Sequence, residues 1–133
     1  MALTKDRNTP ERAGGLLVLP VKGGVKIFAG SLVAVENGFA IPGKTAISLK
    51  AAGRAEEYMD NSGGADGAAT IKVARGVFRF KNSVTDPIAA ADVLGDCYIE
   101  DDETVAKTDG AGTRSKAGKI LAVEPEGIWV EVR

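Results

Sequence analysis

Short apolar and β-branched runs, separated by Gly, Asp and Asn, recur along most of this chain. The clearest case is the apolar run 32–36, which is followed by Asn37-Gly38 and by a second apolar run, 39–41. Asn and Gly both tolerate a positive φ, which the tight turn of a β-hairpin requires. The pattern therefore predicts a hairpin with its turn at Asn37-Gly38.

Two further hairpins are predicted in the last third of the chain. Residues 96–100 and 104–107 are expected to pair across an Asp-Asp turn, and residues 119–123 and 128–132 across a turn that contains Pro and Gly. In the last run the apolar residues occupy alternate positions, which is the period of a strand with one buried face.

The earlier segments also predict strands, although their partners are not evident. Residues 16–21 and 25–28 form two short apolar runs joined through Gly23-Gly24. Residues 70–81 predict one long strand, and the parity of its apolar positions changes at Gly76, which indicates a β-bulge.

Residues 44–59 are ambiguous. A helix over residues 46–58 is one interpretation, but Gly53 interrupts it, since glycine is unfavourable inside helices. We prefer a strand over residues 51–59.

Roughly eight or nine short strands at turn-marked intervals predict an all-β fold, a small β-barrel or sandwich of short antiparallel strands. The composition agrees, because 17 Gly, 44% hydrophobic and 5% aromatic residues suit a turn-rich chain with a core of Val, Ile, Leu and Ala. A length of 133 residues suits one domain. We expect an extended N-terminal arm over residues 1–14 and a single β-domain over residues 15–133.

Charge and reactive side chains argue against several classes of function. A net charge of −1 gives no field that would attract nucleic acid or a membrane. Neither a membrane-spanning apolar run nor the pattern of a signal peptide is present. The chain has no His, and its one cysteine, Cys97, lies in an apolar run and predicts a small buried side chain. We therefore expect no enzyme activity, catalytic residue, cofactor or metal site.

Residues 38–45 (GFAIPGKT) match the pattern G-x-x-x-x-G-K-[ST] of phosphate-binding loops. Such a loop follows a buried parallel strand and opens a helix, so that backbone N–H groups surround the phosphates. Here Gly38 belongs to the predicted turn, and Pro42 removes one N–H donor. We interpret the match as a coincidence within the hairpin, and we keep nucleotide binding through Gly38 to Thr45 as an alternative.

Two acidic segments resemble metal-binding loops only in part. Residues 60–71 lack the central Gly and the final Glu of a calcium loop, because Ala65 and Ile71 stand at those positions. Residues 101–103 (DDE) lie at the predicted tip of a hairpin, where we expect a solvated acidic turn.

The polar segment 1–14 carries charges of both signs close together, and its proline keeps it out of a regular ladder. We interpret it as an arm that becomes ordered on a neighbouring subunit. The candidate residues for a capsid or subunit interface are Lys5, Arg7, Asn8, Pro10 and Arg12. A frayed terminus is the alternative.

The order of several short segments is similar to that of a known family. These segments are Arg7-Asn8-Thr9-Pro10, residues 25–30 (VKIFAG), 53–57 (GRAEE), Asp60-Asn61, 75–78 (RGVF), 97–102 (CYIEDD), 104–106 (TVA), 118–120 (GKI) and 127–130 (GIWV). Through them nearly the whole chain resembles the small capsid cement (head decoration) proteins of Mu-like tailed bacteriophages.

The resemblance implies a β-rich structural protein of the virion, a homotrimer bound to the outside of the phage head at its three-fold positions. Its partner would be the major capsid protein, which it would stabilise, and it would be made in the cytoplasm of the host bacterium. The family offers no catalytic residue to carry over. A tail or neck subunit is the alternative, because it would share the β-fold.

Overall fold

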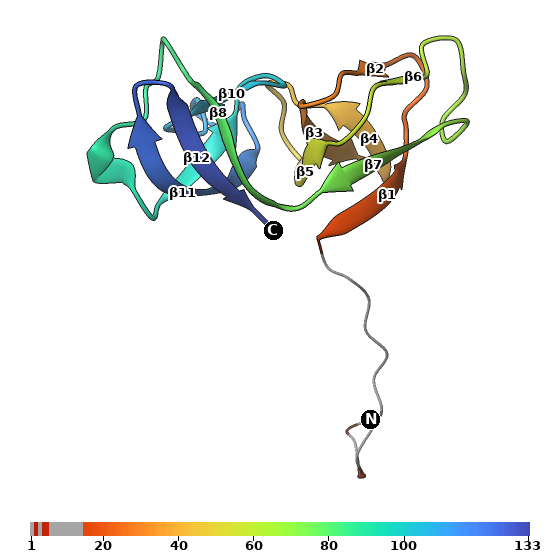
Figure 1. Ribbon diagram of the computed structural model, residues 1–133, viewed down its shortest axis with the longest axis horizontal. Helices are drawn as coiled ribbons and strands as arrows, with labels where there is room; N and C mark the ends of the chain where they lie inside the picture. The colour runs from red at the N-terminus through yellow and green to blue at the C-terminus, as the bar shows by residue number, and fades with distance from the viewer. Residues whose placement is uncertain (1, 3, 6–14) are drawn as a thin grey trace.

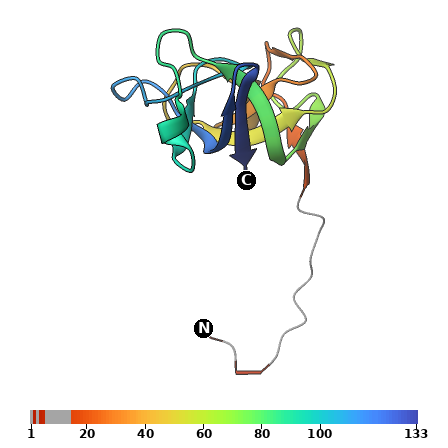
Figure 2. The ribbon, with the colours of Figure 1, turned by 60° about the vertical axis from the view of Figure 1, so that its left-hand side comes forward.

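The computed structural model describes residues 2, 4, 5 and 15–133. These residues form twelve β-strands and a single 3₁₀ turn, η1 (Ala90–Asp92), with no α-helix among them. The predicted all-β class is therefore confirmed. Figures 1 and 2 show two lobes that lie side by side, one from each half of the chain. Within this described part, no helix has the length and apolar character needed to cross a membrane.

The first lobe is built on a five-stranded antiparallel sheet with the strand order β1-β7-β5-β3-β4. The strands are β1 (Leu16–Pro20), β3 (Leu32–Glu36), β4 (Phe39–Pro42), β5 (Lys50–Ala55) and β7 (Thr70–Ala74). A parallel bridge between Val21 and Ala40 links the end of β1 to β4, so the two edges of the sheet approach each other. A separate two-stranded ladder joins β2 (Lys26–Ile27) to β6 (Met59–Asp60).

The second lobe is a closed barrel with the strand order β10-β8-β12-β11-β9. Its strands are β8 (Gly76–Asn82), β9 (Asp96–Ile99), β10 (Thr104–Ala106), β11 (Lys116–Glu124) and β12 (Gly127–Val132). All neighbours are antiparallel except β8 and β10, which pair in parallel and close the ring. Closure leaves the barrel without a free sheet edge.

The three predicted hairpins are all present. β3 pairs with β4 around Asn37-Gly38, whose φ angles of 51° and 87° are the positive values that this turn requires. β9 pairs with β10, and β11 pairs with β12. In β12 the side chains of Ile128, Val130 and Val132 are buried, as the alternation predicted.

The strands on either side of Gly23-Gly24 exist but do not pair with each other. β1 pairs with β7 and β2 pairs with β6, both from farther along the chain. Backbone hydrogen bonds of the two glycines explain the difference, because the Gly23 N–H donates to the Asp66 carboxylate (2.8 Å) and the Gly24 N–H to the Asn61 carbonyl (2.9 Å). The loop after β6 therefore holds this turn.

The predicted single strand over residues 70–81 is two strands. β7 pairs within the first lobe, whereas β8 pairs with β12 and β10 in the barrel, so the chain crosses between lobes at Arg75. The change of parity at Gly76 marks this crossing and not a bulge within one ladder. Gly76 has a φ of 154°, which favours glycine. The strand predicted over residues 51–59 is likewise split, into β5 and β6.

Two hydrophobic clusters form the core, and β3 contributes to both. Leu32 and Ala34 belong to the larger cluster with the barrel residues, while Val33 points into the cluster of the first lobe. Since side chains alternate along a strand, β3 is covered on both faces, and all three residues are fully buried. The lobes therefore share a core, and their contact brings the loop before β3 against the tip of the β9–β10 hairpin.

Candidate interaction surface

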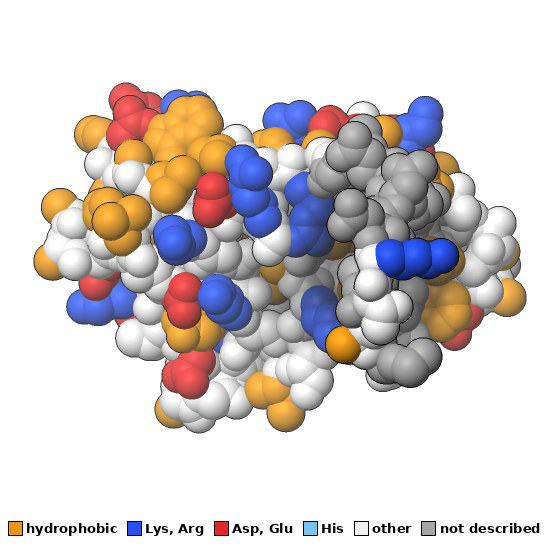
Figure 3. Space-filling model, turned by 90° about the horizontal axis from the view of Figure 1, so that it is seen from below, with side chains coloured by type: hydrophobic (Ala, Val, Ile, Leu, Met, Phe, Trp, Pro, Cys, Tyr) orange, Lys and Arg blue, Asp and Glu red, His pale blue; other side chains and the backbone are white. Residues whose placement is uncertain are grey.

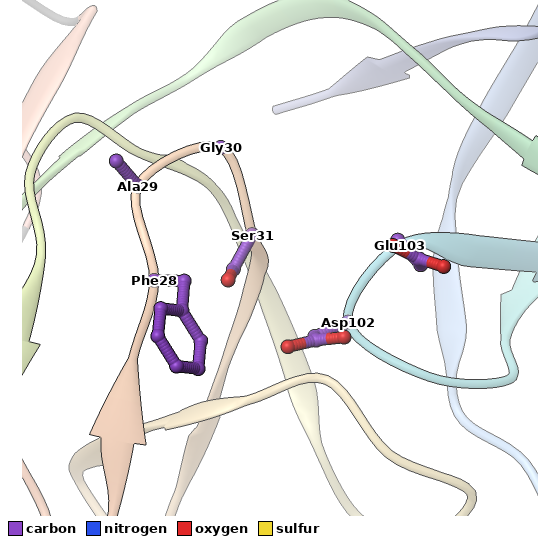
Figure 4. Close-up of a pocket in the computed structure, with 6 residues that line it drawn as sticks. All are labelled: Phe28, Ala29, Gly30, Ser31, Asp102 and Glu103. Carbon is purple, nitrogen blue, oxygen red and sulfur yellow. The ribbon is translucent and has the colours of Figure 1, made fainter.

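A pocket of about 520 Å³ lies where the two lobes meet. It is lined by Phe28, Ala29, Gly30 and Ser31 from the loop between β2 and β3, and by Asp102 and Glu103 from the tip of the β9–β10 hairpin (Figure 4). The two walls are joined by backbone pairing, because the Leu32 N–H donates to the Asp102 carbonyl at 2.8 Å. The pocket is thus a fixed feature of the interface between the lobes.

One wall of the pocket is aromatic. The Phe28 side chain is 59% exposed, and its ring contacts that of Tyr58, which is 49% exposed, with 5.3 Å between the ring centroids. Two aromatic rings left in contact with water cost free energy that burial would recover. The sequence predicted Phe28 only as the end of a strand over residues 25–28, whereas in the fold it directly follows β2 and precedes a Gly-containing turn.

The opposite wall is acidic. Burial raises the pKa of Asp102 above its usual range, the Asp101 and Glu103 carboxylates add to this effect, and a hydrogen bond from Ser31 opposes it. Glu103 forms an ion pair with Lys81 at 2.8 Å, whereas Asp102 has no ion pair with any residue that the structure describes. The prediction of a solvated turn holds for Asp101 and Glu103, which are exposed, whereas the neighbouring lobe covers part of Asp102.

A second surface feature is an apolar tip in the turn between η1 and β9, defined by the adjacent residues Val93 and Leu94. Leu94 is 69% exposed and Val93 is 38% exposed, whereas Val84, which is 93% exposed, lies in the separate loop after β8. Leu94 also has a φ of 71°, which is unfavourable for a side chain of its kind. Its N–H donates to the Ile120 carbonyl at 2.7 Å, which holds the strained conformation in place. Strain of this kind is typical of functional positions.

The underside of the molecule mixes charges of both signs, with Lys and Arg side chains gathered along its middle (Figure 3). On the outer side of the barrel the guanidinium carbon of Arg79 lies 5.9 Å from the centre of the Trp129 ring. Such a contact orders both side chains but contributes only about 0.5–1 kcal/mol at an exposed position.

Most of the interface residues predicted from the sequence lie outside the described residues. This applies to Arg7, Asn8, Pro10 and Arg12. Lys5 is described and is exposed. Their role as a capsid or subunit interface stays a prediction.

The segment that resembles a phosphate-binding loop has the hairpin geometry. Phe39 to Pro42 form β4, and no helix begins at Gly43 or Lys44, because the next regular element is the strand β5. The Lys44 ammonium lies 3.4 Å from a Glu36 carboxylate oxygen, and the Thr45 hydroxyl donates to the Glu100 carbonyl at 2.8 Å. The side chains that would meet phosphate and magnesium therefore have partners within the protein.

Residues 61–67 form a loop that follows β6. The Ser62 hydroxyl and N–H both donate to the Asp60 carboxylate, and these bonds lower the pKa of Asp60. Asn61, which is buried, donates to the Val21, Lys22 and Ala65 carbonyls. The loop is thus held by hydrogen bonds that the Asp60 and Asn61 side chains make.

A buried polar network ties the loops at one end of the barrel together. Arg114, whose side chain is 13% exposed, lies 2.9 Å from the Asp86 carboxylate and 3.6 Å from that of Glu100. The Thr108 hydroxyl donates to Asp86, and the Ser83 hydroxyl to Glu100. The bond from Thr108, with help from Arg114, holds the pKa of Asp86 below its usual range.

We expect Arg114→Met to lower the free energy of unfolding by about 2–3 kcal/mol, because it leaves two half-buried carboxylates without their shared cation. Lys116→Met is the matched control, since Lys116 forms an exposed ion pair with Asp96 and should lose less than about 1 kcal/mol. Urea denaturation measures the loss in both variants, and equal losses would contradict the prediction.

The stability of the fold should also depend on the protonation of Asp86. Its lowered pKa stabilises the fold at neutral pH, and this contribution is lost as the pH falls below 3.8, the ordinary value of the pKa.

Cys97 is a fully buried side chain in β9, as predicted. Burial raises the pKa of its thiol to about 12. We expect a thiol reagent at pH 8 to label the native protein at least about a thousandfold more slowly than the denatured chain, since labelling requires unfolding. Because the unfolded thiol ionises near pH ~8.5, its contribution to stability is present below that pH and is lost as the pH rises towards 12. Cys97→Val should remove this part of the loss of stability at alkaline pH. Fast labelling of the native protein would show that Cys97 is not buried.

No protein-family model, curated protein or solved structure matches this chain. The family resemblance noted from the sequence therefore stays a prediction. The geometry supplies a β-scaffold of two packed lobes that presents a pocket with an aromatic and an acidic wall and a strained apolar tip.

Proposed function

We propose that this chain is a structural subunit of a bacteriophage particle, a cement protein that binds the outside of the head and stabilises it. The apolar tip carries the proposal. Exposure of the strained Leu94 and of the adjacent Val93 to water costs free energy, which is recovered when a partner covers the tip. The sequence resemblance supports a capsid as that partner.

The shape of the molecule is also suited to this role. The start of β1, where residues 1–14 join the domain, and the C-terminus lie on the same side of the two lobes (Figures 1 and 2). A scaffold attached through several weak surfaces to a repeating lattice gains from multivalency, so each contact need contribute little.

Leu94→Asn tests the apolar tip without damaging the fold. Asn tolerates a positive φ better than Leu, so we expect unchanged or slightly increased thermal stability together with at least about tenfold weaker binding to capsids. Ala111→Asn is the matched control, because Ala111 is exposed and has a similar φ of 60°. Co-sedimentation with capsids assembled from the major capsid protein of the same genome measures the binding. Full binding of Leu94→Asn would reject the tip as the contact.

An electron-microscopy map of the particle tests the proposal as a whole. Copies at the three-fold positions outside the head would support it. Copies at the tail or neck would instead favour the alternative structural role, and absence from purified virions would refute both.

Deletion of residues 2–13 should weaken binding to capsids and leave the thermal midpoint of the β-domain almost unchanged, because these residues are too polar to join its core.

A further inference from the structure

The pocket between the lobes combines groups of three kinds from distant parts of the chain. Phe28 supplies an aromatic ring, Ser31 a hydroxyl, and Asp102 a carboxylate. In Figure 4 the Phe28 ring and the Asp102 carboxylate face a common space, with the Ser31 hydroxyl between them. Because the two walls belong to different lobes, their approach is a property of the tertiary fold and not of one loop.

The charge of this pocket is not balanced. Lys81 neutralises Glu103, but Asp102 lacks an ion-pair partner among the described residues. A partly buried carboxylate in this position attracts a cation, since the surrounding protein screens the charge less than water does. A metal ion would need several oxygen ligands, and Asp102 is the one carboxylate lining this pocket without a cation beside it.

The aromatic wall selects the kind of cation. The face of the Phe28 ring attracts ammonium and guanidinium groups, and it also provides apolar surface for methylene groups. The pocket volume of about 520 Å³ is large enough for a side chain of the length of lysine or arginine. Both walls therefore suit a ligand with an apolar stem and a cationic end.

We propose that this pocket binds an alkylammonium or guanidinium group of the size of a lysine or arginine side chain, with its stem on Phe28 and its charge against Asp102. The site goes beyond the cement role and does not depend on it. The same chemistry has two sources: a free amine, or a basic side chain of a protein. Residues 1–14 of a second copy offer three such side chains, Lys5, Arg7 and Arg12.

The direct test is a titration of the full-length protein, followed through its backbone amide signals. The probes are the N-acetyl, N-methylamide derivatives of lysine and arginine, with norleucine as the neutral control. We expect saturable shifts at Gly30, Ser31 and Asp102 with the two cationic probes, and at least about tenfold weaker binding of norleucine. No saturable shift with either cationic probe would overturn the proposal.

Two variants connect binding to the pocket. Asp102→Asn keeps the shape of the side chain, and Phe28→Ala removes an exposed ring, so both variants should fold. We expect each to weaken binding of the lysine probe by about fivefold or more. Asp109→Asn is the matched control, because Asp109 is an exposed carboxylate that does not line the pocket. Unchanged affinity in Asp102→Asn, or an equal loss in Asp109→Asn, would also overturn the proposal.

A peptide of residues 1–14 distinguishes the two sources. Binding at the same amides at least about tenfold tighter than the lysine probe, and lost when Lys5, Arg7 and Arg12 are replaced by norleucine, would identify the arm of a second copy as the ligand. Peptide binding no tighter than the single amino acids would assign the pocket to a free amine. Either result agrees with a cation site, and neither depends on whether capsids bind this protein.

Discussion

Gly53→Ala is expected to destabilise the protein by about 3–5 kcal/mol, the largest effect of a one-carbon change in this chain. Gly53 has a φ of 147°, which other residues rarely adopt, and a Cβ at this position would overlap the Ala74 carbonyl oxygen. The obstacle is backbone, so it cannot move aside as a flexible side chain would. The β3–β5 register also shifts at this point, which marks an irregularity that depends on the glycine.

Urea denaturation followed by Trp129 fluorescence and by circular dichroism measures this effect. Gly63→Ala is the matched control, because a Cβ there meets no atom within 4 Å. Its free energy of unfolding should stay within about 0.5 kcal/mol of the wild-type value. A destabilisation of less than about 1 kcal/mol in Gly53→Ala would contradict the close approach of Gly53 in β5 to the Ala74 carbonyl in β7.

Leu32→Ala is expected to lower the free energy of unfolding by about 2–5 kcal/mol and to weaken both lobes together. Leu32 belongs to β3 of the first lobe, yet it is fully buried in the cluster formed mainly by barrel residues such as Ile99 and Ile120. Removing its side chain therefore leaves a cavity between the lobes. Loss of this contact should affect the Trp129 signal of the barrel as much as signals from the first lobe.

Hydrogen exchange of backbone amides in the two lobes distinguishes joint from separate weakening. Amides of Val73 in the first lobe and Val130 in the barrel should lose protection by a similar factor. Val84→Ala is the control, since its side chain is 93% exposed and its loss should change neither signal. Reduced protection in the first lobe alone would show that the lobes unfold independently.

If the lobes unfold as one unit, the pocket between them is as rigid as the core. That rigidity bears on both proposals, because a preorganised pocket and a fixed apolar tip lose little conformational entropy on binding. Leu32 is the link, since its side chain fills the shared core while its N–H binds the Asp102 carbonyl.

The local elements of this protein could be predicted from its amino-acid sequence. The Asn37-Gly38 hairpin, the β9–β10 and β11–β12 hairpins, the burial of Cys97 and the all-β class all follow from turn residues and apolar alternation within a few positions. These signals are reliable because the partners are close in the chain, and the turn alone brings them together.

The way in which these elements combine could not be predicted, because it depends on contacts between distant segments. The pairing of β1 with β7, the crossing at Arg75 and the meeting of Phe28 with Asp102 join segments far apart in sequence. An apolar strand pattern states that one face is buried, but it does not state against which partner. That choice depends on how well whole surfaces fit. The acidic turn therefore looked fully solvated in the sequence, although the first lobe covers part of it in the fold.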